Sequence, residues 1–273
     1  MNYYAVIGNP IAHSISPRLH NAAFNALGVE NIYSRALLDI IPDPTVQQKA
    51  LKDLIFDLHL SGANITVPFK EVALAIAHEV DDTAAQIGSA NTLIIDNDRI
   101  SAHNTDAPGF MMAINEFAGI TDALILGAGG TARAIAYILA QNDVKVNVLN
   151  RSEGRADAFK NYNFYTPQSY VSKAHKHDLI VNTTPSGLSF DGLPFDESLL
   201  KNAMINAKYA LDAVYGKPSA FLDLAKRSGL KCKDGLDMLL FQAVLACKYF
   251  SDSSDELAIT QAMRQAINLP KIF

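Results

Sequence analysis

The sequence lacks several features that would assign it to common classes of protein. It has no basic excess, because 23 Lys and Arg against 28 Asp and Glu give a net charge of −5, whereas a nucleic-acid-binding protein presents a basic surface. No apolar run is long enough to cross a bilayer, and Met1 to Ile7 is expected to form a strand instead of a charged and apolar leader. We therefore expect no nucleic-acid partner, no membrane contact and a cytoplasmic location.

Cysteine is scarce, and histidine shows no clustering. Cys232 and Cys247 are the only two cysteines, and no C-x-x-C spacing occurs, which is typical of free thiols in a reducing compartment. The seven histidines are scattered along the chain, without the spacing of a metal site. The sequence therefore predicts free thiols and no bound metal.

A regular alternation of strands and helices runs through the whole chain. With 273 residues, of which 49% are apolar, the chain exceeds the usual size of one domain, and two domains are expected. Short apolar runs of strand length alternate with longer segments of helical character, and a hairpin is expected at residues 93–103. This alternation predicts an α/β fold.

The most informative stretch is Ala123–Ala134, in which an apolar run is followed at once by Gly127, Gly129 and Gly130. A glycine turn between a buried strand and a helix leaves backbone N–H groups pointing into open space at the N-terminus of the helix, which is the positive end of its dipole. A dinucleotide pyrophosphate binds there. The spacing is G-x-G-G-x-x-x-A, in which Ala134 takes the last small-residue role. Glycine turns also serve as plain connections, and that alternative stays open.

The end of the next expected strand, 145–149, bears on the choice of cofactor. An NAD-binding fold carries an acidic residue here for the ribose hydroxyls, whereas this sequence has Asn150 followed by Arg151 and Arg155. These residues favour the 2′-phosphate of NADP(H), and a solvated loop with ordinary arginines is the alternative. A further strand, 179–182, is expected to end at Thr183 facing the same crevice.

Three candidates for substrate chemistry lie in the first half, and each has a structural alternative. Ser14 and Ser16 precede an expected helix, so their hydroxyls either cap it or donate to an anionic group. Lys70 opens a helix expected over 71–78, where a cation opposes the helix dipole; it is either a solvated lysine or one that handles a proton. Asp106 precedes a helix expected over 108–118 and could act as its N-cap.

Together these motifs resemble the shikimate dehydrogenase family over essentially the whole chain. Each matching stretch is short, but their joint order is specific. The stretches are Gly8-x-Pro10, His13-Ser-x-Ser-Pro17-x-x-His20-Asn21, Gly62-Ala-Asn-Ile-Thr-x-Pro-x-Lys70, Asn91-Thr92, Asn104-Thr-Asp106, Gly127-x-Gly-Gly, Asn150-Arg151, Asp212-x-Val-Tyr215 and Gly235-Leu-x-Met-Leu-x-x-Gln242.

The resemblance implies a two-domain α/β fold in which the domains flank a cleft. Residues 1–106, completed by C-terminal helices in 239–273, would bind substrate, and residues 107–238 would form a Rossmann-like NADP-binding domain. The implied reaction is the reversible, NADPH-dependent reduction of 3-dehydroshikimate to shikimate in aromatic amino-acid biosynthesis. The expected partner is this small-molecule substrate, and the oligomeric state is left open between monomer and homodimer.

The resemblance also implies roles for individual residues, with Lys70 and Asp106 as the catalytic pair. Ser14 and Ser16 would hold the substrate carboxylate, and the remaining substrate contacts would be Thr66, Lys70, Asn91, Asp106, Tyr215 and Gln242. The cofactor contacts would be Gly127, Ala128, Gly129, Gly130, Asn150, Arg151, Ser152, Arg155, Thr183, Gly235 and Met238. The sequence departs from the family pattern where Ala107-Pro108 replaces a glycine, Ser152 replaces a threonine and Pro218 lies one residue further from Tyr215.

Two other functions remain open. The first is a quinate/shikimate dehydrogenase that uses NAD or NADP. The second is a non-catalytic dinucleotide sensor on the same fold, against which the presence of both Lys70 and Asp106 argues.

Overall fold

The computed structural model describes residues 1–172, 176–187 and 192–269. The chain forms two compact units, of which unit 1 comprises residues 1–109 and 240–273 and unit 2 comprises residues 110–239. Each unit is built on a six-stranded sheet flanked by helices, so the α/β class expected from the sequence is confirmed. The chain leaves unit 1 within helix α5 (Asp106–Ala113) and returns within helix α10 (Leu236–Ser251).

The sheet of unit 1 has the strand order β2-β1-β3-β5-β6-β4. Strands β1, β2 and β3 pair in parallel, whereas β5 runs antiparallel to β3 and β6 antiparallel to β5. The remaining elements of unit 1 are β1 (Asn2–Gly8), α1 (Ser16–Ala26), β2 (Asn31–Leu37), α2 (Pro44–Asp57), β3 (Leu60–Ile65), α3 (Lys70–Ala75), β4 (Glu79–Val80), α4 (Asp82–Ile87), β5 (Thr92–Asp96), β6 (Arg99–His103) and α11 (Glu256–Asn268).

This pairing gathers four loops at one edge of the sheet. The parallel strands β1 and β3 end at that edge, the antiparallel β5 begins there, and β6 ends there. Residues 9–15, 66–69, 88–91 and 104–105 therefore meet at a single edge, although they are widely spaced in the sequence.

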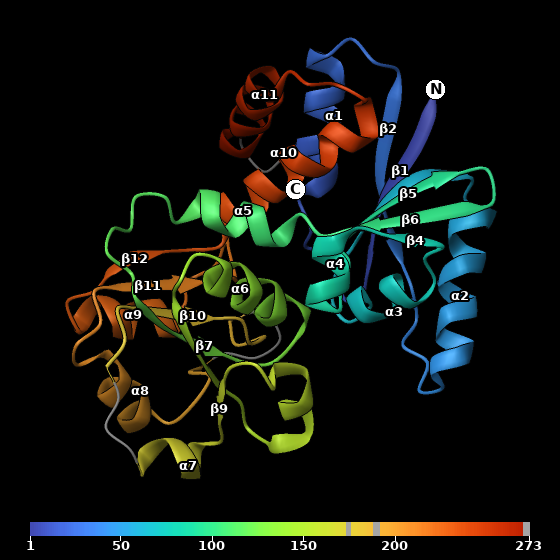
Figure 1. The fold of residues 1–273 in the computed structure, drawn as a ribbon. Coiled ribbons are helices and arrows are strands. Elements are labelled where there is room, and N and C mark those ends of the chain that lie inside the picture. The colour runs from blue at the N-terminus through green and yellow to red at the C-terminus, as the bar shows by residue number, and fades with distance from the viewer. Residues whose placement is uncertain (173–175, 188–191, 270–273) are drawn as a thin grey trace. The chain divides into compact units, whose positions relative to one another are not determined.

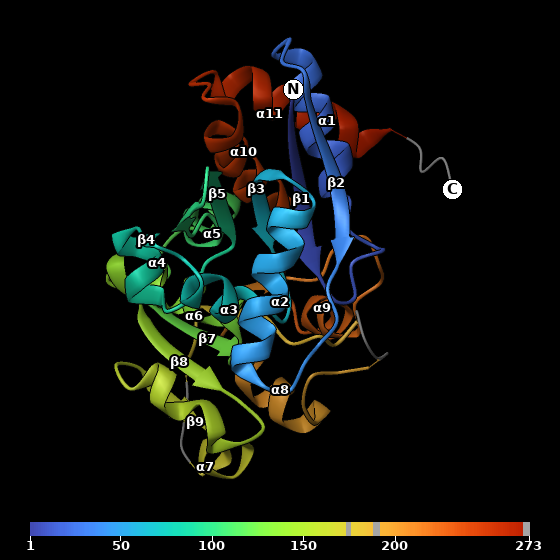
Figure 2. The ribbon, with the colours of Figure 1, turned by 90° about the vertical axis from the view of Figure 1, so that its right-hand side faces the viewer.

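Both faces of this sheet are covered by helices (Figures 1 and 2). On one face Ile7 packs with Leu51, Ile55 and Phe69 from α2 and the turn before α3. On the other face Tyr4 contacts the rings of Phe24 and Phe250, from α1 and α10. Alternate residues of β1 thus supply two cores, as the two-residue period of a strand requires.

The sheet of unit 2 is entirely parallel, with the order β12-β11-β10-β7-β8-β9. This is the doubly wound order of a Rossmann fold, in which ligands bind at the crevice where the strand order reverses; here that point lies between β7 and β10. The elements are β7 (Asp122–Leu126), α6 (Gly130–Gln141), β8 (Lys145–Leu149), the 3-10 helix η1 (Glu153–Phe159), β9 (Asn163–Tyr165), α7 (Pro167–Val171), β10 (Leu179–Asn182), α8 (Glu197–Met204), β11 (Tyr209–Asp212), α9 (Ala220–Arg227) and β12 (Lys231–Lys233).

Several element boundaries differ from those expected. Strand β3 ends at Ile65, because the Phe69 amide donates to the Thr66 carbonyl (2.9 Å) and closes a turn. Helix α3 ends at Ala75 instead of His78, whose amide donates to Ile100 of β6 (2.8 Å) and draws the chain towards the sheet. Helix α5 spans Asp106–Ala113, not 108–118.

Candidate functional site

A buried ion pair joins Lys70 and Asp106 in unit 1. Lys70 is the first residue of α3 and Asp106 the first of α5, and the Lys70 ammonium contacts Oδ2 of Asp106. Only 11% of the Lys70 side chain and 8% of the Asp106 side chain are exposed. Each side chain is thus largely removed from water, and the charge of its partner offsets the cost of burial. A buried charge without a partner would be strongly destabilising.

The backbone before α5 leaves the Asp106 carboxylate available for this pair. Asn104 Oδ1 accepts hydrogen bonds from the amides of Asp106 (3.1 Å) and Ala107 (3.2 Å), so Asn104 caps the helix and Asp106 does not. Pro108 falls in the first turn, where a backbone N–H is not needed. The helix thus accommodates Ala107-Pro108, and the capping alternative for Asp106 is wrong.

The Asn91 amide connects Asp106 with two other side chains. Its Nδ2 donates to Oδ1 of Asp106 (2.9 Å), to Oγ1 of Thr105 (2.9 Å) and to Oε1 of Gln242 (3.3 Å). Gln242 lies on α10, which crosses α5 closely. A Cβ at Gly109 of α5 would lie 2.7 Å from the backbone nitrogen of Gln242. Lys70, Asn91, Asp106 and Gln242 are therefore gathered in one polar cluster of unit 1.

Ser14 and Ser16 lie in and directly after the loop that follows β1, at the same edge of the sheet. Both are buried, and their hydroxyl oxygens are 3.2 Å apart. Helix α1 begins at Ser16 after the N-cap residue Ile15, which makes no side-chain cap, and the Ser14 hydroxyl accepts from the Ser16 backbone amide (3.3 Å). Ser14 therefore bonds to the first turn of α1, whereas no such bond is seen for the Ser16 hydroxyl in the described residues. The Arg35 guanidinium donates through Nε to the Ser14 carbonyl (2.8 Å) and fixes the loop. Thr66, half-buried, follows β3 at this edge.

In unit 2 the glycine turn lies at the point where the strand order reverses. Gly127 has φ +100°, and a Cβ there would lie 2.9 Å from Oγ1 of Thr183, which follows β10. Helix α6 begins at Gly130, and its N-cap residue is Gly129, which has no side chain. A Cβ placed at Gly129 would have no other atom within 4 Å. Gly127, Ala128, Gly129, Gly130 and Thr183 thus surround one helix N-terminus, as a pyrophosphate site requires.

The remaining expected cofactor residues follow β8 or lie at the start of α10. Arg151, Ser152 and Arg155 are exposed, and Asn150 donates through Nδ2 to the Ser152 carbonyl (2.9 Å). Gly235 and Met238 are buried, Gly235 directly against the Ala213 carbonyl. Tyr215, expected to contact substrate, is half-buried in the loop after β11.

A buried carboxyl, Asp212, anchors that same loop. It accepts from Asn182 Nδ2 (3.0 Å), from the Val214 amide (3.0 Å) and from the Ser219 hydroxyl. Burial raises the pKa of Asp212 to about 6, although these hydrogen bonds favour the charged form. Asp212 thus ties β10, β11 and α9 together around the Tyr215 loop.

We expect the stability of the protein to fall as Asp212 ionises. Because its pKa is raised in the folded state from about 3.9 in an unfolded chain, its stabilising contribution is complete below about pH 4 and is lost as the pH rises through about 6. The expected loss is about 3 kcal/mol, measured as the difference in unfolding free energy between wild type and Asp212→Asn at pH 4 and pH 7. The exposed Asp223 provides the control variant Asp223→Asn, and a pH-independent difference for Asp212→Asn would contradict this expectation.

Four side chains that take part in the cluster were not expected from the sequence. Asn104 caps α5, Thr105 shares the Asn91 amide, and Asn64 and Thr92 extend the hydrogen bonds into the sheet. The signal that could have found them lies in the motifs, because all four residues fall within the stretches that resemble the family.

Two negative expectations can be compared with the described part of the chain. No helix within residues 1–172, 176–187 and 192–269 is long and apolar enough to cross a membrane. Over the same residues, no three His, Cys, Asp or Glu side chains gather as metal ligands.

Comparison with known proteins identifies the relatives of this chain. Residues 6–93 match the shikimate dehydrogenase substrate binding domain. The shikimate dehydrogenase (NADP(+)) of Helicobacter hepaticus is 42% identical over 255 residues, which cover 92% of this chain and 91% of the relative. Shikimate dehydrogenase from Aquifex aeolicus aligns with a TM-score of 0.83 at 30% identity over 98% of both chains.

A second solved structure was determined with NADP(H) and shikimate bound. It is shikimate 5-dehydrogenase from Thermus thermophilus in complex with NADP(H) and shikimate, which aligns with a TM-score of 0.78 at 34% identity over 97% of this chain and 100% of that chain.

Proposed function

This chain belongs to the shikimate dehydrogenase family, and we propose that it interconverts 3-dehydroshikimate and shikimate with NADP(H). The observation that carries this proposal is the buried Lys70–Asp106 pair, held at the loop edge of unit 1 by Asn91 and Gln242. The Asp106 carboxylate holds the Lys70 ammonium in one direction, as proton delivery to an alkoxide requires. The presence of this pair favours a catalyst over a dinucleotide sensor.

We assign substrate binding to unit 1. Ser14, Ser16 and Thr66 supply hydroxyls at the same edge as Lys70 and Asp106. The Ser14 hydroxyl donates to the Ser16 hydroxyl (3.2 Å), and both can turn their hydrogens to a bound carboxylate, which accepts hydrogen bonds only. Asn91 and Gln242 complete the set within unit 1, and Tyr215 stays a substrate contact predicted from the sequence.

The residues of unit 2 fit NADP(H). The positive φ of Gly127 and the glycine N-cap of α6, which has no side chain, suit a pyrophosphate, and the exposed Arg151 and Arg155 suit a 2′-phosphate. When bound, the cofactor supplies the hydride. The remaining proposed contacts, around these groups, are Ala128, Gly129, Gly130, Asn150, Ser152, Thr183, Gly235 and Met238.

The side chains of unit 1 handle the proton. Reduction of a ketone carbonyl develops negative charge on its oxygen, and the Lys70 ammonium stabilises that charge and donates a proton to it. Asp106 holds the ammonium in place through Oδ2 and accepts from Asn91 through Oδ1. The reaction in the oxidative direction is the reverse: the neutral amine that Lys70 becomes on donating its proton accepts the hydroxyl proton of shikimate and returns to the ammonium form.

We further propose a cytoplasmic location, which the two free cysteines Cys232 and Cys247 support.

The test of the proposed function is a two-by-two assay of shikimate and quinate against NADP⁺ and NAD⁺, followed by the absorbance of the reduced nicotinamide. Turnover of shikimate with NADP⁺ is the expected result. A preference for quinate, or for NAD⁺, would favour the quinate/shikimate dehydrogenase alternative, and no turnover with any pair would favour the sensor.

We expect kcat/KM for shikimate to exceed that for quinate by about 10²-fold. Quinate carries an added hydroxyl at the carbon that bears the carboxylate, where Ser14 and Ser16 leave little room, and rejection of an added hydroxyl is of this order. The double variant Ser14→Ala, Ser16→Ala should raise the shikimate KM at least about tenfold, since hydrogen bonds to a charged group are lost. Ser101→Ala removes an exposed hydroxyl of the same unit and is the control. Equal kcat/KM for the two acids would refute the preference.

A further inference from the structure

A hydrogen-bonded chain leads from the aromatic core of unit 1 to Asp106. Tyr33 of β2 donates its hydroxyl to Oδ1 of Asn64 (2.6 Å). Asn64 Nδ2 donates to Oγ1 of Thr92 (3.1 Å), and the Thr92 hydroxyl donates to Oδ1 of Asn91 (3.2 Å). The Asn91 Nδ2 then donates to Asp106 (2.9 Å).

The direction of this chain is fixed by backbone groups at both amides. The Thr105 N–H can only donate, and it donates to Asn91 Oδ1 (2.8 Å), so Nδ2 of Asn91 must face Asp106. The backbone carbonyl of Asn91 can only accept a hydrogen bond, and it accepts one from Asn64 Nδ2 (3.2 Å). Oδ1 of Asn64 must therefore face Tyr33. The Tyr33 hydroxyl is therefore the donor that begins the chain.

Tyr33 is itself held rigidly. Its ring stacks on the His20 ring, with centroids 4.1 Å apart and an angle of 3° between the planes. His20 is fully buried, and burial lowers its pKa to about 3, so the stacked ring is neutral. Burial also raises the pKa of Tyr33 well above its ordinary value, which keeps the hydroxyl protonated as a donor.

We propose that Tyr33 is a positioning residue for the reaction, acting through Asn64, Thr92 and Asn91 on the orientation of the Asp106 carboxylate. This inference rests on the proposed function of the Lys70–Asp106 pair and deepens it. With Asn91 on Oδ1 and Lys70 on Oδ2, both oxygens of Asp106 are occupied by donors. Loss of the Tyr33 hydroxyl leaves Asn64 Oδ1 without its donor, so that the amide is held only through Nδ2, by the Asn91 backbone carbonyl and Thr92, and the chain is loosened at its start.

The matched control is Tyr4, which belongs to the same aromatic core. Its hydroxyl is buried and donates to the Phe250 carbonyl (2.7 Å), so Tyr4→Phe removes the same group from the same surroundings. The Tyr4 hydroxyl has no part in the chain that leads to Asp106.

The experiment is a double-mutant cycle on the oxidation of shikimate by NADP⁺. We expect Tyr33→Phe to lower kcat about tenfold, with KM for NADP⁺ within twofold of wild type. In an Asn91→Ala background, where the chain is cut, Tyr33→Phe should change kcat by less than about twofold, because coupled residues are not additive. Tyr4→Phe should leave kcat within about twofold of wild type.

An equal effect of Tyr33→Phe with and without Asn91 would overturn the proposal, as would an equal effect of Tyr33→Phe and Tyr4→Phe. If Tyr33→Phe does not fold, the link is tested at Thr92. Thr92→Val should then lower kcat about tenfold and Thr92→Ser should restore it, and unchanged kcat in Thr92→Val would likewise overturn the proposal. Wild-type turnover of shikimate tests the proposed function separately, whichever way these variants behave.

Discussion

Replacement of Lys70 by alanine is expected to lower kcat for shikimate oxidation by about 10²-fold or more, the usual scale for a positioned proton donor or acceptor. The expected change in the shikimate KM is much smaller, because the Ser14 and Ser16 hydroxyls, the groups that we propose for the carboxylate, are left in place. The measurement is steady-state kinetics with both substrates varied. A variant with near-normal kcat would remove Lys70 from the mechanism.

Controls must separate chemistry from folding in this variant. Lys70→Ala leaves the Asp106 carboxylate buried and unpaired, which destabilises a protein by about 3–5 kcal/mol, so its melting temperature must be measured alongside. Asp106→Asn keeps the size of the side chain without its charge, and it should also lower kcat strongly. Lys49→Ala removes a lysine from an exposed ion pair with Asp53 and should leave kcat unchanged.

Replacement of Arg151 by alanine is expected to raise the NADP⁺ KM at least about tenfold, with little effect on the KM for NAD⁺. A guanidinium offers paired donors to a 2′-phosphate, and one charge-assisted contact of this kind contributes about 1.5–3 kcal/mol. The effect should shrink at high salt, because Arg151 is exposed and its field is screened. The KM values for both cofactors, at low and high salt, give the answer.

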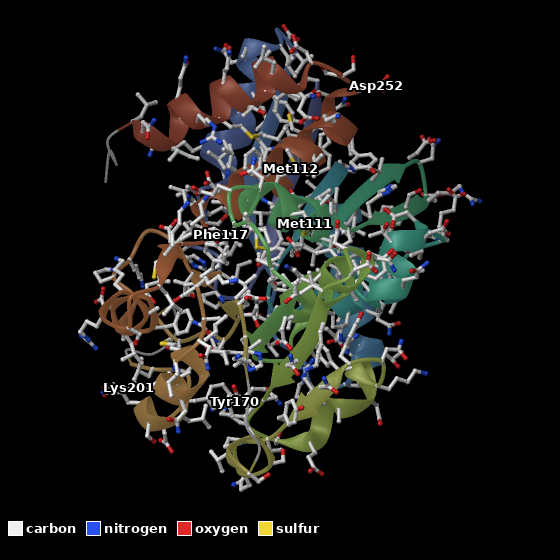
Figure 3. The ribbon with its side chains drawn as sticks, turned by 60° about the vertical axis from the view of Figure 1, so that its left-hand side comes forward. Met111, Met112, Phe117, Tyr170, Lys201 and Asp252 are labelled. Atoms are coloured by element: carbon white, nitrogen blue, oxygen red, sulfur yellow. The ribbon has the colours of Figure 1, made fainter. Side chains whose placement is uncertain are left out.

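Lys201 supplies a matched control for this charge. It lies on α8 of the same unit (Figure 3) and is exposed, paired with Glu197. Lys201→Ala also removes one positive charge. It should not change either KM, because Lys201 lies on α8 and not in the segment after β8 where we propose the 2′-phosphate contact. Equal losses of NADP⁺ and NAD⁺ in Arg151→Ala would contradict a phosphate contact.

The sequence was a good guide to elements defined by local pattern. Strand β8 covers Lys145–Leu149 and β10 covers Leu179–Asn182, both as predicted, because short segments rich in Val, Leu and Ile and bounded by turn residues suffice to mark a buried strand. The Rossmann order of unit 2 was likewise signalled by the glycine turn after β7.

Pairwise contacts between distant residues could not be predicted in the same way. Tyr33 and Asn64 lie on β2 and β3, the two strands that flank β1, and the Tyr33 side chain reaches Asn64 only in this strand order and register. Neither residue carries a local sequence signal of that order. Similarly, Asp106 looked like a helix cap, and only the geometry of the chain before α5 shows that Asn104 takes that role. The polar cluster brings Lys70, Asn91, Asp106 and Gln242 together, whereas the individual roles of the site residues stay predictions.

The path of the chain through its two units has a consequence for biosynthesis. Unit 2 is one uninterrupted stretch, whereas unit 1 needs α10 and α11 from the far end of the chain to cover α1 and Tyr4. During synthesis, domains fold as their residues emerge from the ribosome, so β1 and α1 can be covered only after α10 and α11 have been made. Unit 2 can therefore be complete on the ribosome while the apolar side chains of β1 and α1 still lack their cover.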